Sequence, residues 1–282
     1  MKKSVQFLAP AKINLSLEVR GKRADGFHEI DTLMVPISLA DTLDIESASG
    51  GGVAFTCSDA TLPTGDDNLV VRAAKLFYDR LGETPDVRIH LEKRVPHGAG
   101  LGGGSSDAAS TLMGLNEIHG EPFDTRNLAG MAAQLGSDIP FFVYRSAAVC
   151  KGRGEIVEPV EFAGALPLLL IKPPFGVPTP WAYKHWSDSR EVPGIPYGAQ
   201  VFPWGKLVND LERPVFEKYL FLALLKRWLL AQEEVAGALM SGSGSTTLAV
   251  LRDASLAPAL CEKIAAEYGD GLWTCACASA AQ

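Results

Sequence analysis

The sequence predicts an α+β protein with two lobes, and three observations support this. The first third of the chain is rich in strand-forming segments, two helices follow one another over residues 105–136, and a new series of elements begins near residue 165. Two successive helices do not fit an α/β array in which strands and helices alternate strictly. We therefore expect an N-terminal lobe over residues 1–160 and a C-terminal lobe over residues 161–282.

The N-terminal lobe is expected to begin with three strands. They are VQFLAPAKINLSLEV (5–19), MVPISLADTLDIESA (34–48) and VAFTCS (53–58), separated by polar and glycine-rich turns. Residues 66–82 then change to helical spacing, with an Asp or Asn cap at the start and Gly82 at the end. DVRIHLEKRV (86–95) alternates between apolar and polar residues, which predicts a strand that Pro96 ends.

Two helices are expected next, one from about Ser105 to Ile118 and one after the capping residue Asp124. The segment SDIPFFVY (137–144) predicts a return to extended structure. The C-terminal lobe then reads as a further series of elements: a strand LPLLLIKPP (166–174), a short helix PTPWAYKHW (178–186), a long helical region (208–234), a strand LAVL (248–251), a helix (256–269) and a strand LWTCACA (272–278).

Composition and charge exclude several classes of function. The formal net charge is −7 and the Lys and Arg residues are scattered, so nothing predicts binding to nucleic acid or to an anionic membrane. The five cysteines have neither a zinc spacing nor a disulfide pattern. No signal peptide is recognisable and no apolar run reaches membrane-spanning length. We expect a cytoplasmic protein, a monomer or weak homodimer, with no resident metal.

The segment PHGAGLGGGSSDAAS (96–110) lies between a predicted strand and a predicted helix. Backbone amides at a helix N-terminus lack internal partners, and glycines let an anion approach them, so the segment predicts a phosphate-binding loop. GAGLGG also satisfies the dinucleotide pattern G-x-G-x-x-G, which is typical of nicotinamide-dependent dehydrogenases. The second helix that follows makes this interpretation weaker, because a strand is expected there. Two alternatives stay open here: a tight linker in which Ser105 or Ser106 caps the helix, and a nucleotide-binding module without catalysis.

PHGAGLGGGSSDAA resembles the phosphate-loop signature of the GHMP kinases, the superfamily of galactokinase, homoserine kinase and mevalonate kinase. PAKINLSLEV (10–19) and MSGSGSTTLAV (240–250) are similar to two further motifs of that superfamily, in the same order. The resemblance implies the two-lobed GHMP kinase fold, with an N-terminal lobe like ribosomal-protein-S5-domain-2 and a ferredoxin-like C-terminal lobe. It also implies ATP as co-substrate, together with Mg²⁺.

Within the superfamily, residues 10–32 are similar to the kinases that phosphorylate the 2-hydroxyl of 4-diphosphocytidyl-2-C-methyl-D-erythritol, in non-mevalonate isoprenoid biosynthesis. NLVVRAAKL, QLGSDIPFFV, PTPWAYK and the NDLE of 209–212 extend the resemblance over almost the whole chain. A GHMP kinase for another small alcohol, such as homoserine or a mevalonate derivative, is the nearest alternative. Those acceptors offer no base to stack on an aromatic ring.

The resemblance assigns roles to individual residues. Asp138 matches the catalytic aspartate, and Lys12 is expected beside it, where its charge keeps the carboxylate ionised and faces the transferred phosphoryl group. The residues expected to bind ATP are Pro96, His97, Gly98, Ala99, Gly100, Leu101, Gly102, Gly103, Gly104, Ser105 and Ser106. The residues expected to bind the acceptor substrate are Asn14, Phe27, His28, Tyr183, Gly242, Ser243 and Gly244.

Several of these assignments have simpler competitors. Phe27 stands where the family usually has tyrosine, so stacking on a base is kept and any hydroxyl bond is lost. Without the resemblance, Phe27 and Tyr183 read most simply as core residues, Asp138 as a turn or helix-terminal aspartate, and the Gly242 loop as a connector. Asp107 is left outside the catalytic set, as a helix cap or a contact to magnesium through water.

Overall fold

The computed structural model describes residues 4–162 and 164–279. Its largest sheet is built on two long strands, β1 (Ser4–Lys22) and β2 (His28–Ser47), which pair antiparallel along their length. The strand order is β3-β4-β2-β1-β9-β8, and β5 and β6 branch from β2. The bounds of the six further strands are β3 Gly52–Cys57, β4 Asp86–Glu92, β5 Ala148–Gly152, β6 Ile156–Pro159, β8 Gln200–Phe202 and β9 Gly205–Asn209.

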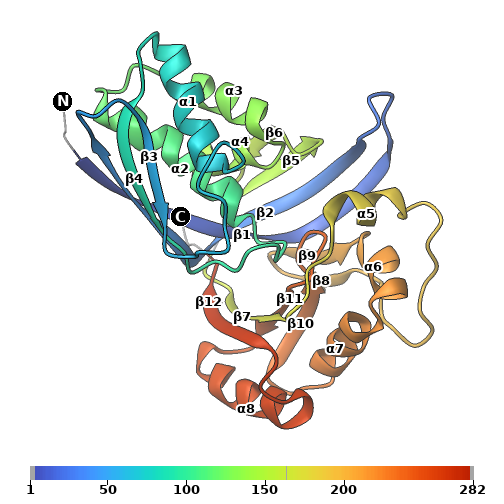
Figure 1. Ribbon diagram of the computed structural model, residues 1–282. Helices are drawn as coiled ribbons and strands as arrows, with labels where there is room; N and C mark the ends of the chain where they lie inside the picture. The colour runs from blue at the N-terminus through green and yellow to red at the C-terminus, as the bar shows by residue number, and fades with distance from the viewer. Residues whose placement is uncertain (1–3, 163, 280–282) are drawn as a thin grey trace.

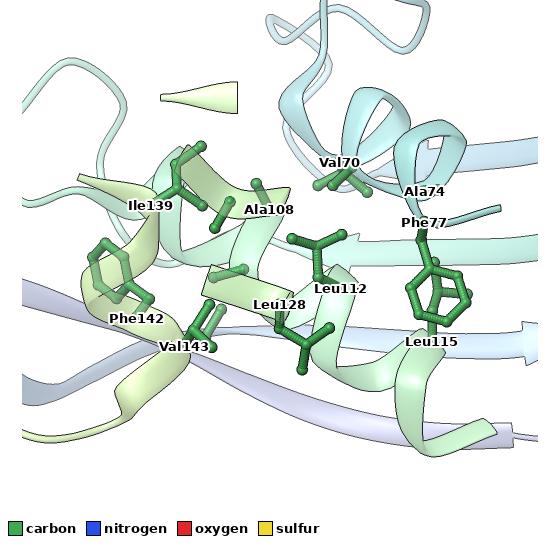
Figure 2. Close-up of a cluster of buried hydrophobic side chains, with 14 of the residues drawn as sticks. Val70, Ala74, Phe77, Ala108, Leu112, Leu115, Leu128, Ile139, Phe142 and Val143 are labelled. Carbon is green, nitrogen blue, oxygen red and sulfur yellow. The ribbon is translucent and has the colours of Figure 1, made fainter. Parts of the chain in front are cut away.

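Four helices cover one face of this sheet (Figure 1). They are α1 (Leu69–Leu81), α2 (Gly103–Ile118), α3 (Thr125–Leu135) and α4 (Ile139–Tyr144). Figure 2 shows their apolar side chains meeting in one buried cluster, in which Phe77, Leu112, Leu128 and Phe142 come from one helix each. The length of α1 agrees with its capping residues: Asn68 Oδ1 accepts the Val70 amide at one end, and Gly82 is left-handed at the other.

The second sheet is fully antiparallel, in the order β10-β11-β7-β12. Its strands are β7 (Pro167–Lys172), β10 (Val235–Met240), β11 (Thr247–Leu251) and β12 (Trp273–Ala278). The remaining helices are α5 (Thr179–Lys184), α6 (Glu212–Lys218), α7 (Leu220–Leu230), the single turn η1 (Ala254–Leu256) and α8 (Ala257–Tyr268). Figure 1 shows α7 and α8 on the far side of this sheet from the first one.

The two sheets meet through the alternation of side chains on β7. Leu169 and Ile171 pack with α7 and α8, while Leu168 and Leu170 point the other way into a cluster with residues of β1. The β1 residues in that cluster are Ala11, Ile13 and Leu15. Because their side chains face the second sheet, the side chains of Lys12 and Asn14 lie on the opposite face of β1.

Two expectations about secondary structure were wrong. Residues 139–144 form the helix α4 and not a strand. A short apolar run has no periodicity that distinguishes a helix from a strand, so the contacts of this segment with α2 and α3 determine its conformation. The long helical region 208–234 is instead the end of β9 followed by α6 and α7, which are separated at Tyr219. The helix expected from about Ser105 to Ile118 is confirmed as α2, which begins at Gly103 with Gly102 in the N-cap position.

The sequence pattern also missed several strands. Strands β5, β6, β8 and β10 were not expected, and β2 begins at His28, six residues before the expected start. These segments are short or contain glycine. Strand β5 pairs with the distant strand β2, whereas β6, β8 and β10 pair with the neighbouring strands β5, β9 and β11. In the described part of the chain all five cysteines are free, and no helix there is long and apolar enough to cross a membrane.

Candidate active site

A cleft of about 1020 Å³ runs along the face of β1 that carries Lys12 and Asn14, between the glycine segment (residues 96–106), the β1–β2 hairpin and α5. Most of the site residues expected from the sequence line it: Lys12, Asn14, Phe27, His28, Pro96, His97, Gly98, Ala99, Gly100, Gly102, Gly103, Gly104, Ser105, Asp138, Tyr183, Gly242 and Ser243. Leu101, Ser106 and Gly244 lie outside this lining. Residues from distant parts of the sequence therefore share one cavity.

Lys12 and Asp138 form an ion pair in this cleft, with 3.8 Å between Nζ and Oδ2. The lysine Nζ also donates a 2.6 Å hydrogen bond to Asn14 Oδ1, and Asn14 Nδ2 donates to Thr32 Oγ1 at 2.8 Å. Burial lowers the pKa of Lys12, and the negative charge of Asp138 opposes that shift. A lysine in a strand is usually solvated, whereas Lys12 is buried and held in place by its neighbours.

The position of Asp138 follows from the start of α4. Asp138 occupies the N-cap position, yet its side chain makes no capping hydrogen bond, so the carboxylate is left free to point into the cleft. Gly154 lies against it, because a Cβ at that glycine would be only 3.0 Å from Asp138 Oδ1. Asp138 is therefore a helix-terminal residue, as the simpler interpretation has it, but its side chain does not cap α4.

The glycine segment is held by its carbonyl groups. Ala99 O accepts the Thr246 amide, Gly100 O accepts the Ser241 hydroxyl, and Leu101 O accepts the Lys12 amide, at distances of 3.2, 3.2 and 2.9 Å respectively. Gly98, Gly100 and Gly102 have positive φ, while the alternating Ala99 and Leu101 are buried. The segment is therefore a fixed turn between β4 and α2.

The serines after the glycines do not cap α2. The N-cap is Gly102, which has no side chain, and Ser105 and Ser106 lie inside the helix. Ser105 lines the cleft, whereas Ser106 is buried and its hydroxyl has no hydrogen-bond partner in the described residues. The tight linker with a serine cap is therefore wrong. The free amides of the first turn of α2 face an open cleft instead.

A buried ion network, which no sequence pattern predicts, lies beside the first turn of α2. Lys93 Nζ contacts Asp41 Oδ2 at 2.5 Å and Asp107 Oδ2 at 2.9 Å. The second oxygen of Asp107, Oδ1, has no partner in the part of the chain that the structure describes. Burial raises the pKa of Asp107 to about 8, against the charge of Lys93. Asp41 is some fifty residues from Lys93, so no local pattern links them.

Aromatic rings line the end of the cleft near the β1–β2 hairpin. The rings of His28 and Tyr183 stack with 5.4 Å between centroids, and Trp186 meets His28 edge-on at 6.1 Å. Figure 1 shows α5, which carries Tyr183, below the tip of the hairpin. Phe27 is 52% exposed, so its interpretation as a core residue is wrong. Burial raises the pKa of Tyr183, and the charge of Asp138 acts in the same direction.

The loop between β10 and β11 closes the site opposite the glycine segment. A Cβ on Gly242 would lie 3.5 Å from Lys12 Nζ, so this loop borders the ion pair directly. Asn209, another residue with no assigned role, fixes the loop: its Nδ2 donates to Met240 O at 2.6 Å and to Gly242 O at 2.8 Å. Ser243 Oγ is 2.7 Å from Thr179 Oγ1, next to α5.

Comparison with known proteins decides the family. Residues 68–146 match the model of the GHMP kinases N terminal domain. A 4-diphosphocytidyl-2-C-methyl-D-erythritol kinase of Methylacidiphilum infernorum (isolate V4) is 43% identical over 272 residues, which cover 95% of this chain and 94% of the relative. This chain belongs to the 4-diphosphocytidyl-2-C-methyl-D-erythritol kinase family.

The solved structures agree with membership of the 4-diphosphocytidyl-2-C-methyl-D-erythritol kinase family. A crystal structure of a 4-(cytidine 5'-diphospho)-2C-methyl-D-erythritol kinase matches with a TM-score of 0.81 and 36% identity, covering 98% of this chain and 100% of that one. The homoserine kinase of Cytophaga hutchinsonii matches with a TM-score of 0.69 at 17% identity, covering 100% and 96%, which concerns the fold alone. The two-lobed GHMP kinase fold is confirmed, and the dehydrogenase interpretation is excluded. As a kinase of this family, the protein uses ATP.

Proposed function

We propose that the protein transfers the γ-phosphoryl group of ATP to the 2-hydroxyl of 4-diphosphocytidyl-2-C-methyl-D-erythritol, a step of non-mevalonate isoprenoid biosynthesis. One observation carries the proposal: the Lys12–Asp138 pair lies where the glycine segment and the aromatic end of one cleft meet. A nucleotide on one side and a cytidyl group on the other would bring the phosphoryl group and the hydroxyl together beside this pair.

In this proposal Asp138 is the base that accepts the proton of the attacking hydroxyl. Its carboxylate is partly exposed in the cleft and accepts no hydrogen bond from the described residues that would block it. Lys12 supplies the positive charge that stabilises the transferred phosphoryl group. The acceptor is a tertiary alcohol and hence a crowded nucleophile, so fixed positioning matters more than covalent chemistry.

The segment from Pro96 to Ser106 is proposed to bind ATP, with the phosphates at the amides of the first turn of α2. Magnesium would be held between those phosphates and the protein. The unpartnered Asp107 Oδ1 and the cleft-facing Ser105 suit an ion that takes few protein ligands and keeps much of its water. When bound, the ion neutralises phosphate charge. No group of three or more His, Cys, Asp or Glu that could form a separate metal cage occurs in residues 4–162 and 164–279.

The acceptor substrate is proposed to lie along the hairpin and α5. Phe27 and Tyr183 offer ring faces for the cytosine, and His28 offers a ring nitrogen for its edge. Asn14 and the loop Gly242–Gly244 would contact the part of the substrate near the phosphoryl group. Gly244 lies behind the lining residues, so its contribution would be to the shape of the loop.

The wider assignment is also a proposal. The protein would be cytoplasmic, a monomer or weak homodimer, with lobes over 1–160 and 161–282 and no partner among nucleic acids or membranes. The acidic composition and scattered basic residues support the absence of such partners. Although β8 and β9 belong to the second half of the chain, they extend the sheet of the first half beside β1.

The test is ADP release from ATP and Mg²⁺ by the purified protein. We expect turnover with 4-diphosphocytidyl-2-C-methyl-D-erythritol and none above background with homoserine, mevalonate or galactose. Turnover confined to one of the other alcohols would keep the kinase and change the acceptor. Absence of turnover on every acceptor, with ATP still bound in a titration, would favour a nucleotide-binding module without catalysis.

A further inference from the structure

Arg153 lies in the turn between β5 and β6 and lines the same cleft. Its guanidinium carbon is 4.8 Å from the centroid of the Phe27 ring, the distance of a cation–π contact. The contact is between residues 126 positions apart in the sequence. Arg153 therefore forms part of the wall at the end of the cleft where Phe27, His28 and Tyr183 gather.

Most N–H donors of the Arg153 guanidinium have no partner in the described residues. Arg153 Nε is 3.4 Å from Glu155 Oε1, a long contact, and this is the one hydrogen bond of the side chain within the described residues. Its two terminal nitrogens have no partner there. A guanidinium carries five N–H donors and stays charged in any protein environment, so four donors of this group are free for an acceptor in the cleft.

The turn that carries Arg153 is anchored on both sides. The Gly152 amide donates to Glu29 Oε1 at 3.1 Å, and Glu29 Oε2 accepts from Arg23 at 2.5 Å, which ties the turn to the hairpin. The Arg153 amide donates to Glu155 Oε2 at 2.6 Å, and Gly154 packs on Asp138. The backbone of the turn is thus fixed at the wall of the cleft before any ligand arrives, and this reduces the entropy lost when Arg153 binds one.

We propose that Arg153 is a substrate-binding residue, which donates its free N–H groups to acceptor atoms of the cytidine diphosphate end of the acceptor substrate. The inference rests on the proposed function. Two sources of acceptor exist in that end: the carbonyl and ring nitrogen of the pyrimidine, and the oxygens of the diphosphate. Both present the lone pairs that a planar, charged fork of donors binds well. A role confined to stabilising the turn would leave the terminal nitrogens unused.

The test is a set of binding titrations with cytidine, CMP, CDP and ADP on the wild-type protein, Arg153→Met and Arg153→Lys. Arg145→Met is the matched control, because the Arg145 guanidinium also lies over a ring, that of Phe7 at 5.5 Å, but does not line the cleft. We expect Arg153→Met to weaken CDP binding roughly 10- to 100-fold, the loss of one or two charge-assisted hydrogen bonds. ADP binding and the Arg145→Met titrations are expected to match the wild type, and Arg153→Lys to fall in between.

The three cytidine ligands identify the acceptor. Equal weakening for cytidine, CMP and CDP assigns the contact to the base, and weakening for CMP and CDP alone assigns it to the phosphates. In turnover, Arg153→Met is expected to raise the KM for the acceptor substrate with kcat within about twofold of the wild type. Unchanged CDP binding in the folded variant would overturn the inference while the kinase assignment stands. A wild-type protein that binds no cytidine nucleotide would overturn the proposed function and this inference with it.

Discussion

Lys12 and Asp138 lie 3.8 Å apart, yet the side chain of the lysine is 4% exposed and that of the aspartate is 39% exposed. The cation is enclosed by β1, the glycine segment and the Gly242 loop, while the carboxylate stands at the open side. This asymmetry suits a base that must reach a substrate and a cation that must stay in place. The first two predictions separate these two roles.

Asp138→Asn is expected to lower kcat roughly 100-fold or more, because the amide cannot accept the proton of the hydroxyl while it keeps the size of the carboxylate. The KM for ATP is expected to change little, since Asp138 is outside the glycine segment. Steady-state measurement of ADP release gives kcat, and circular dichroism checks that the variant is folded. A folded variant with kcat near that of the wild type would rule out Asp138 as the base.

Lys12→Met is expected to change the pH dependence of stability. Because burial lowers the pKa of Lys12 in the folded state, the unfolded chain holds the proton over a pH range in which the folded protein has lost it. The charged lysine therefore costs stability below its folded pKa, and the cost disappears as the pH rises toward 10.5, the ordinary pKa of a lysine. Relative to Lys12→Met, the wild type should gain about 1.4 kcal/mol for each unit by which the pKa is lowered. Urea titrations at about pH 7 and about pH 10 measure this difference, and a constant difference would contradict it.

Most of the fold was predictable because its signals are local. The cap and stop of α1, the proline after β4 and the alternation on β7 each depend on a few adjacent residues. Residues 139–144 were not predictable in this way, because IPFFVY is apolar throughout and its helical form depends on packing against α2 and α3. Strand β5, which was not expected, likewise depends on pairing with β2, more than a hundred residues away, and β6 in turn pairs with β5.

The residues of the candidate site also fall into two groups, those with a local sequence signal and those without one. The glycine segment and PAKIN were recognisable as motifs, and the alternation along β1 placed Lys12 and Asn14 on one face. Lys93, Asn209 and Arg153 were missed because each acts through contacts with residues far away in the sequence. The folded arrangement brings Lys93 and Arg153 to the cleft and places Asn209 against the Gly242 loop that borders it.

Gly100→Ala is expected to be much more damaging than Gly98→Ala. Both glycines have positive φ, so each substitution carries a backbone cost of about 1 kcal/mol. A Cβ at Gly98 meets open space, whereas one at Gly100 collides with the Ser241 carbonyl oxygen and lies 2.9 Å from that of Gly244. Gly100→Ala must therefore push the glycine segment and the Gly242 loop apart. Thermal unfolding and the KM for ATP measure the effect, and equal losses in the two variants would show that the contact between the loops is unimportant.

Asn209→Asp is expected to lower kcat by roughly tenfold, because Asn209 positions the loop that borders Lys12. The carboxylate keeps the acceptor for the Leu211 amide and replaces the donor to Met240 O and Gly242 O with an oxygen that repels them.

The matched control for this effect is Asn116→Asp. Asn116 is also buried and donates to a backbone carbonyl, that of Phe123, near the C-terminal end of α2, whereas the cleft is at the N-terminal end of that helix. Both variants lose about 1 kcal/mol or more of stability through the lost hydrogen bonds, so stability alone does not distinguish them. Assayed below the unfolding temperature of both, Asn116→Asp should keep the kcat of the wild type while Asn209→Asp loses it. Equal kcat in the two variants would mean that Asn209 stabilises the fold without positioning the loop.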